Sequence, residues 1–150
     1  MTWASTLPTV STALVAALDG VLPAGTVRKG PRVGPGSAEA VTVRFQTEDT
    51  PTANGRFSAE GMGVAPSREQ YTIGCAATVR KGAGDVDAAT SRAFELLAAV
   101  GAALAADPTI GGAVLSARLG EWELSETQGA KTGATAVLLF DVDIDAFTAR

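Results

Sequence analysis

Residues 134–144, ATAVLLFDVDI, alternate in character at every second position. One phase is apolar throughout: Ala136, Leu138, Phe140, Val142 and Ile144. Side chains on a β-strand point alternately to the two faces of a sheet, so this pattern predicts a strand that buries one face. The second phase begins apolar, with Val137 and Leu139, and becomes acidic at Asp141.

Val137 and Leu139 are therefore candidate interface residues. A solvated face would be polar at these positions, so we expect both side chains to be buried, either under a helix or under a neighbouring subunit. Changing both to Asp should then impair folding or assembly.

The strand before this one, residues 114–124, changes phase in its middle. Leu119 follows one apolar phase and Trp122 follows the other, whereas 134–144 keeps a single phase. One extra residue must be absorbed between them, which predicts a β-bulge. The predicted register is Trp122 with Ala136, Leu119 with Leu138, and Gly120 and Glu121 together opposite Val137.

Three further segments have the character of strands. Residues 70–79, QYTIGCAATV, alternate cleanly, and residues 41–45 alternate over a shorter stretch. Residues 27–32 contain Gly30-Pro31 and are therefore predicted as an edge strand.

Two segments have helical spacing. Residues 86–106 carry an apolar stripe behind an N-cap at Asp85, and Asp107-Pro108 ends the helix. The other helix has Val10, Leu14, Leu18 and Val21 at helical spacing; Thr9 or Ser11 can cap it, and Pro23 ends it. The order α-β-β-β-α-β-β predicts an α+β fold: an antiparallel or mixed sheet of about four to five strands with two helices packed on it. Its length of 150 residues suits a single domain spanning 1–150.

The composition excludes several functions. A net charge of −4 gives no general attraction to nucleic acid or to an anionic membrane. The N-terminal segment has no Lys or Arg before Arg28, unlike a secretory signal, and we see no apolar run of about 18 residues that could cross a bilayer. We therefore expect a soluble protein made inside the cell.

The side chains for most enzyme chemistry are missing. The chain has no histidine, no GxSxG sequence and no Ser-x-x-Lys pair. Cys75 lies in the apolar phase of a strand, where an inert core thiol is expected. The glycines at 82 and 84 do not complete a dinucleotide-binding loop, because Asp87 stands at the third glycine position. We expect no catalytic residue, no cofactor and no metal.

Asp141, Asp143 and Asp145 form the sharpest polar pattern. Their spacing matches the first ligands of a calcium loop, but the sixth position, which needs glycine, is Ala146. A solvated strand face is favoured over a weak cation site or a pair of catalytic carboxylates.

Residues Glu48–Arg68 are predicted to be a long loop between two neighbouring strands. The loop carries Arg56, Phe57 and Met62 among small and polar residues, so we interpret it as a partner-binding segment that is mobile until it binds. Deleting Thr52–Val64 should then leave the fold intact while abolishing assembly.

Two segments resemble the second half of the tail terminator (tail completion) proteins of long-tailed bacteriophages. They are SRAFELLAAVGAALAADPTIGGAVLSARLGEWEL, residues 91–124, and GATAVLLFDVDIDAF, residues 133–147. The shared features are a helix ending in Ala-Asp-Pro-Thr, a Gly-Gly turn at 111–112, and a last strand that opens with Gly-Ala-x-Ala.

The resemblance implies a structural virion protein of the tail, assembled in the host cytoplasm. Such a protein forms a homo-oligomeric, hexameric ring that caps the tail tube and stops its polymerisation. The partners it implies are further copies of the chain, the tail tube protein and the head–tail connector, with no membrane. DNA would pass through the lumen without specific binding, and Asp141, Asp143 and Asp145 could line that lumen. The alternatives are another head–tail connector or tube subunit, a small-molecule-binding α+β domain, or a histidine-free enzyme.

Overall fold

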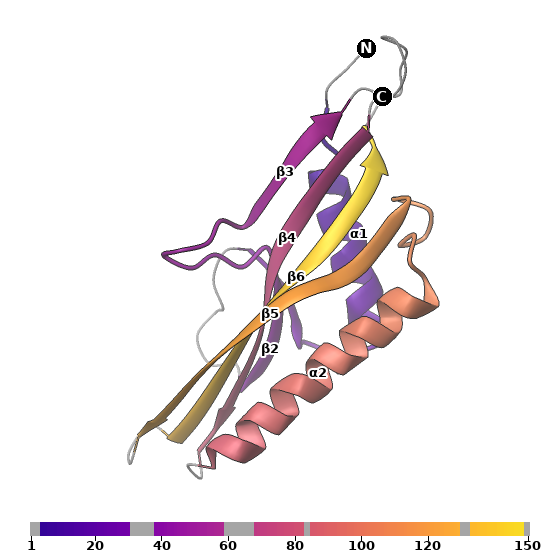
Figure 1. The fold of residues 1–150 in the computed structure, drawn as a ribbon. Helices are drawn as coiled ribbons and strands as arrows, with labels where there is room; N and C mark the ends of the chain where they lie inside the picture. Colours follow the sequence, from indigo (N-terminus) through magenta and orange to yellow (C-terminus); the bar gives the residue numbers. More distant parts are fainter. Residues whose placement is uncertain (1–3, 31–37, 59–67, 83–84, 130–132, 149–150) are drawn as a thin grey trace.

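The computed structural model describes residues 4–30, 38–58, 68–82, 85–129 and 133–148. They form a six-stranded mixed sheet with two helices on one of its faces (Figure 1). This is the predicted α+β class, with one strand more than expected. The elements are α1 (Leu7–Asp19), β1 (Val27–Lys29), β2 (Glu39–Val43), β3 (Ala53–Ser58), β4 (Arg68–Lys81), α2 (Val86–Ala106), β5 (Ser116–Gly129) and β6 (Gly133–Phe147).

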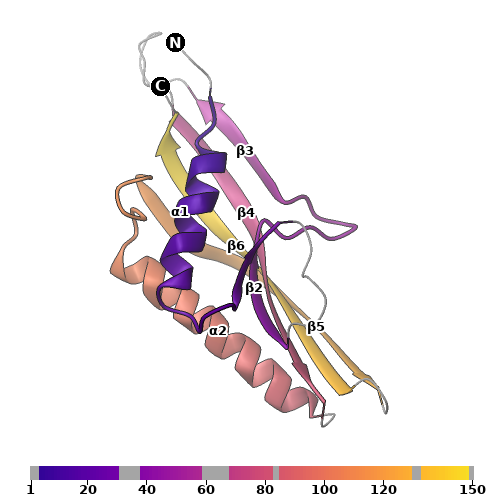
Figure 2. The ribbon, with the colours of Figure 1, turned by 180° about the vertical axis from the view of Figure 1, so that it is seen from behind.

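The two long strands β4 and β6 form the centre of the sheet. They pair antiparallel over their whole length, from Arg68 opposite Phe147 to Lys81 opposite Ala134. β5 pairs with the other side of β6, while β2 and β3 pair with the other side of β4. The even-numbered residues of β6 from 134 to 146 are all buried, as the alternation predicts. Their burial places them on the face that α1 and α2 cover, and Figure 2 shows both helices on that one face of the sheet.

Helix α2 forms where the sequence predicts it. The Asp85 side chain accepts a hydrogen bond from the Ala88 amide at 3.0 Å and so caps the first turn. By length and hydropathy alone this helix could also cross a membrane, contrary to our expectation from the sequence. In the structure its apolar stripe is buried against the sheet: Ala89, Ala93, Leu96, Leu97, Val100 and Leu104.

Helix α1 begins earlier than predicted and its cap comes from a strand. The helix starts at Leu7 with Thr6 as N-cap, so the predicted cap at Thr9 or Ser11 is wrong. The Thr6 side chain makes no capping bond. Instead, the buried Glu69 carboxylate on β4 accepts hydrogen bonds from the Thr6 amide and hydroxyl, and the Tyr71 hydroxyl lies 3.0 Å from that same Thr6 oxygen. A carboxylate at the positive end of a helix dipole is stabilising, and here it fixes α1 to the sheet.

Strands β2 and β3 share one edge of β4, and Gly74 lies between them. Val43 is opposite Cys75 and Ala53 is opposite Ile73. The chain therefore advances ten residues along this edge, from Val43 to Ala53, while β4 advances only two. The intervening residues 44–52 leave the sheet, and we call them the excursion. The Gly74 amide donates to the Thr52 carbonyl at 2.9 Å, and its carbonyl accepts from the Phe45 amide at 2.8 Å. Gly74 therefore keeps the ladder continuous past the excursion.

The prediction of a single long loop over Glu48–Arg68 is wrong in its middle. Residues 53–58 are strand β3, which carries Arg56 and Phe57 and pairs with β4. The alternation that marks other strands is weak in ANGRFS, so this strand was missed. Met62 lies outside the described residues. Deleting Thr52–Val64 would remove β3, so it no longer tests the binding of a loop alone.

The bulge in β5 is confirmed and its register is corrected. Gly120 and Glu121 are the residues at the irregularity, as predicted, but they lie opposite Asp141 rather than Val137. Trp122 pairs with Phe140, four residues further along β6 than expected. The reason is that both strands continue to Gly129 opposite Gly133, through residues that the polar sequence predicts as a loop.

We expect Gly74→Val to lower the free energy of unfolding by about 1–3 kcal/mol. A Cβ at this position would lie 3.2 Å from the carbonyl oxygens of Phe45 and Pro51, and branching adds atoms where no space remains. Urea unfolding followed by circular dichroism measures the effect. Gly82→Val is the control, because nothing lies within 4 Å of its Cβ position. Equal stability of the two variants would contradict the role given to Gly74.

Candidate functional site

The sheet has two unlike faces, and the one without helices is the candidate functional site. We call it the helix-free face. The odd-numbered residues of β6 and the even-numbered residues of β4 point to it, because their alternates are buried under α1 and α2. The predicted acidic row Asp141, Asp143 and Asp145 runs down the middle of this face, half-buried between flanking strands.

One end of the helix-free face holds a network of opposite charges. Arg68 on β4 forms a bidentate ion pair with Asp145, whose Oδ1 accepts from Arg68 Nε at 2.7 Å. Next along the strands, the Thr72 hydroxyl donates to Asp143 Oδ1 at 3.0 Å. Arg56 on β3 donates to Gln70 Oε1 at 2.8 Å. All of these polar groups except Arg68 line an open hollow of about 560 Å³, which Arg118 also lines. The charges here are largely compensated.

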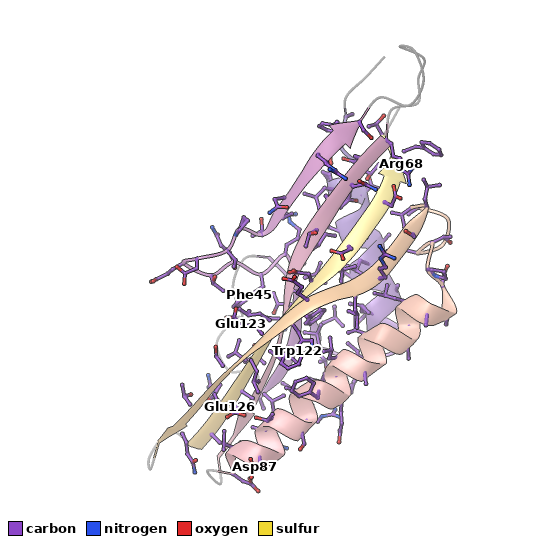
Figure 3. The ribbon with its side chains drawn as sticks, viewed as in Figure 1. Phe45, Arg68, Asp87, Trp122, Glu123 and Glu126 are labelled. Carbon is purple, nitrogen blue, oxygen red and sulfur yellow. The ribbon has the colours of Figure 1, made fainter. Side chains whose placement is uncertain are left out.

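A second hollow, of about 500 Å³, lies around Asp141, and we call it the Asp141 hollow. Phe45 and Pro51 of the excursion form one side, and Glu121 and Glu123 of β5 form the other. Phe45 and Glu123 lie on the same side of the sheet, with Trp122 turned the other way toward α2 (Figure 3). Negative charge is concentrated here without a basic residue among the residues that line the hollow.

The pKa values of the acids differ along one strand. Burial raises the pKa of Asp141 above its ordinary value, and the nearby negative charges of Asp143 and Glu121 add to this. The hydrogen bonds from Arg68 lower the pKa of Asp145. The ionised form of Asp145 is therefore stabilised, whereas the ionised form of Asp141 is less favourable than in a solvated aspartate.

The structure brings together only part of the predicted interface set. Arg56 lies on the helix-free face with the acids, but the neighbouring Phe57 points to the opposite face and is 45% exposed. Val137 and Leu139 lie on the helix-free face. Of the two covers that we expected, a helix or a neighbouring subunit, the helix is excluded, because both helices cover the other face and the two side chains are only half-buried. Cover by a neighbouring subunit stays a prediction.

Sequence reasoning missed the outer edge of β5. Trp122 is 58% exposed although its ring meets the Phe94 ring of α2 edge-on, with centroids 5.1 Å apart. The phase slip had placed Trp122 on the core side but did not reveal that β5 is an edge strand. Knowledge of the sheet order was needed to find it.

The chemistry available on the helix-free face is charge recognition. Cys75 is fully buried, and burial raises the pKa of its thiol to about 12, as expected for an inert core residue. Within the described ranges, no three His, Cys, Asp or Glu residues are grouped so that they could hold a metal ion.

No known family matches the sequence, and no curated protein is significantly similar to it. Among solved structures, a chain from the virion of the native gene transfer agent (GTA) particle is similar to this chain, with a TM-score of 0.43 and 11% identity. The match covers 95% of this chain and 92% of that chain. A likeness at this level of TM-score and identity does not define a family.

We expect Asp141→Asn and Asp145→Asn to change stability in opposite directions at pH 7. The raised pKa of Asp141 means that its ionisation costs stability as pH rises, so Asp141→Asn should stabilise by up to about 1 kcal/mol, as for a like-charge pair across strands. The lowered pKa of Asp145 means that its ion pair stabilises above pH 3.8 and is lost as pH falls further. Asp145→Asn should therefore destabilise by about 0.2–1 kcal/mol at neutral pH.

Unfolding by urea at pH 7 and at pH 3 measures both effects. The differences between each variant and the original chain should shrink at pH 3, where carboxylates gain protons. A loss of stability in both variants at pH 7 would contradict the assignment of Asp141 as a strained anion.

Proposed function

We propose that this chain is a structural subunit of a phage-type tail, a tail terminator that forms a ring on the end of the tail tube. The ring stops polymerisation of the tube and presents a surface for the head–tail connector. The subunit acts through its contacts with other proteins of the tail, without a catalytic residue, a cofactor or a membrane.

One observation carries this proposal: within the described residues, the sheet has helices on one face, edge strands on both sides and the acidic row down the middle of its helix-free face. A ring built from such subunits closes most simply with the helices on the outside and the helix-free faces on the inside. The resemblance of residues 91–124 and 133–147 to tail terminators supports the same function.

The acidic row fits the inner surface of such a ring. Asp141 and Asp143 would repel the phosphates of a duplex, so that DNA passes through the lumen without binding. Val137 and Leu139, which precede Asp141 on the same strand, offer an apolar patch for the tube protein or the connector.

The Asp141 hollow favours a second candidate function, that of a small-molecule-binding domain, because the hollow is a concave site with an apolar wall.

We expect the purified protein to form a closed ring, six subunits in the proposed state, alone or when mixed with tail tubes. Native mass spectrometry of both samples gives the stoichiometry, and electron microscopy shows whether added protein caps tubes and ends their growth. A protein that stays monomeric in both samples and leaves tube length unchanged contradicts the proposal. A ring that adds along the whole tube would favour a tube subunit.

A second experiment tests the inner surface. Replacing Asp141 and Asp143 together by Lys should leave capping intact but give rings that retain DNA in a gel-shift assay, with retention lost as salt is raised. The control is Asp87→Lys, since this acid lies in the first turn of α2 on the other side of the sheet (Figure 3). DNA retention by the control alone would place the helix side toward the lumen.

A further inference from the structure

In the described part of the chain the sheet has edge strands on both sides, β5 on one side and β1 and β3 on the other. β5 pairs only with β6, and β3 pairs only with β4. At the start of β5 the Ala117 amide donates outward to the Pro108 carbonyl at 2.7 Å, so the loop after α2 occupies that end. The stretch Trp122–Thr127, beyond the bulge, has no such backbone partner among the described residues. An open edge of this length is a template for pairing with another strand.

Strand directions allow one copy to continue the sheet of the next. β3, β4, β6 and β5 run alternately in opposite directions, so β3 and β5 are antiparallel to one another. In a ring, every copy has the same orientation along the axis and turns the same face inward. The edge of β5 therefore meets β3 of the adjacent copy, and the two strands pair antiparallel.

The side chains on the two edges select a register. Residues directly opposite in a sheet share a face, so Arg56 on the helix-free face requires a β5 partner on that face. Glu123 is such a residue, is exposed and carries the opposite charge. The same register puts Phe57 opposite Trp122, and both point to the helix side and are 45% and 58% exposed.

The stagger of this register also suits a closed barrel. Within one copy Arg56 is level with Ser116, through Gln70 and Asp145. From Ser116 to Glu123 is seven positions, of which the bulge absorbs one. Six residues at about 3.3 Å give a stagger of about 20 Å across four strands spaced about 4.8 Å apart. The resulting tilt of about 45° lies at the upper end of the range for closed barrels.

We propose that β3 of one copy pairs antiparallel with β5 of the next, with Arg56 opposite Glu123. The partner at this surface is thus a second copy of the chain, and the ring lumen is a continuous sheet. This inference rests on the proposed ring, and it specifies how the ring is held together.

The test is a disulfide between copies. In this register Asn54 lies opposite Ser125, and both are exposed on the helix-free face. The double variant Asn54→Cys with Ser125→Cys should, on mild oxidation, give a ladder of covalent oligomers ending at the ring size. The two positions lie at opposite edges of one sheet, so they cannot join within a copy. Cys75 is buried and does not compete.

Two controls define the register. Each single cysteine variant should give no ladder beyond a dimer. Asn54→Cys with Glu121→Cys shifts the pairing by four residues and should cross-link at least tenfold more slowly. A ladder from the shifted pair in place of the expected one overturns the register.

Charge reversal gives an independent readout in the reduced protein. Arg56→Glu or Glu123→Arg alone should weaken each contact between copies about threefold to fivefold, and the double reversal should restore it. Native mass spectrometry over a dilution series measures this. Rings that form without the cross-link and without charge rescue overturn the pairing but leave the ring function standing. A chain that forms no ring at all overturns both.

Discussion

The full-length pairing of β4 with β6 is the constraint on which the rest of the structure depends. Fourteen consecutive residue pairs hold these strands together, and one phase of each strand is apolar along nearly all of that length. A ladder of this length fixes which residues face the helices and which do not. Both helices must then cover the same face, and the acids of β6 have to share the other. The alternation that builds the core therefore also decides which side chains lie on the helix-free face, the surface proposed for assembly.

The sequence predicted those parts of the fold that are specified locally. Helix α2 was found because Asp85 and Pro108 mark its ends, and β4 and β6 because their alternation is strong. The place of the bulge followed from the phase slip at Trp122.

β3 could not be found in this way, because Asn54 and Gly55 are poor strand residues and only pairing with β4 makes them extended. The register of the last hairpin failed for a related reason, since Glu126 lies on the helix side and is held by the Thr90 hydroxyl rather than by apolar packing.

The candidate site was predicted in its composition but not in its arrangement. The alternation of the sequence is enough to place the three acids on one face of a strand. The lowered pKa of Asp145 depends on Arg68, which is 77 residues away in the chain. The sequence predicts Arg56 and Phe57 as neighbours in one loop, whereas in strand β3 their side chains point to opposite faces of the sheet. Partners that are distant in the sequence decide both outcomes, and local pattern carries no information about them.

The excursion has a consequence for how such chains can diversify. β4 holds β2 and β3 in register separately, so the number of residues between Val43 and Ala53 is not fixed by either ladder. Insertions or deletions between Phe45 and Thr52 can change the wall of the Asp141 hollow, while Gly74 keeps its hydrogen bonds to these two residues and the strands stay in place. Related chains can therefore vary this surface by changing loop length alone, and a designer could graft a recognition sequence at the same point.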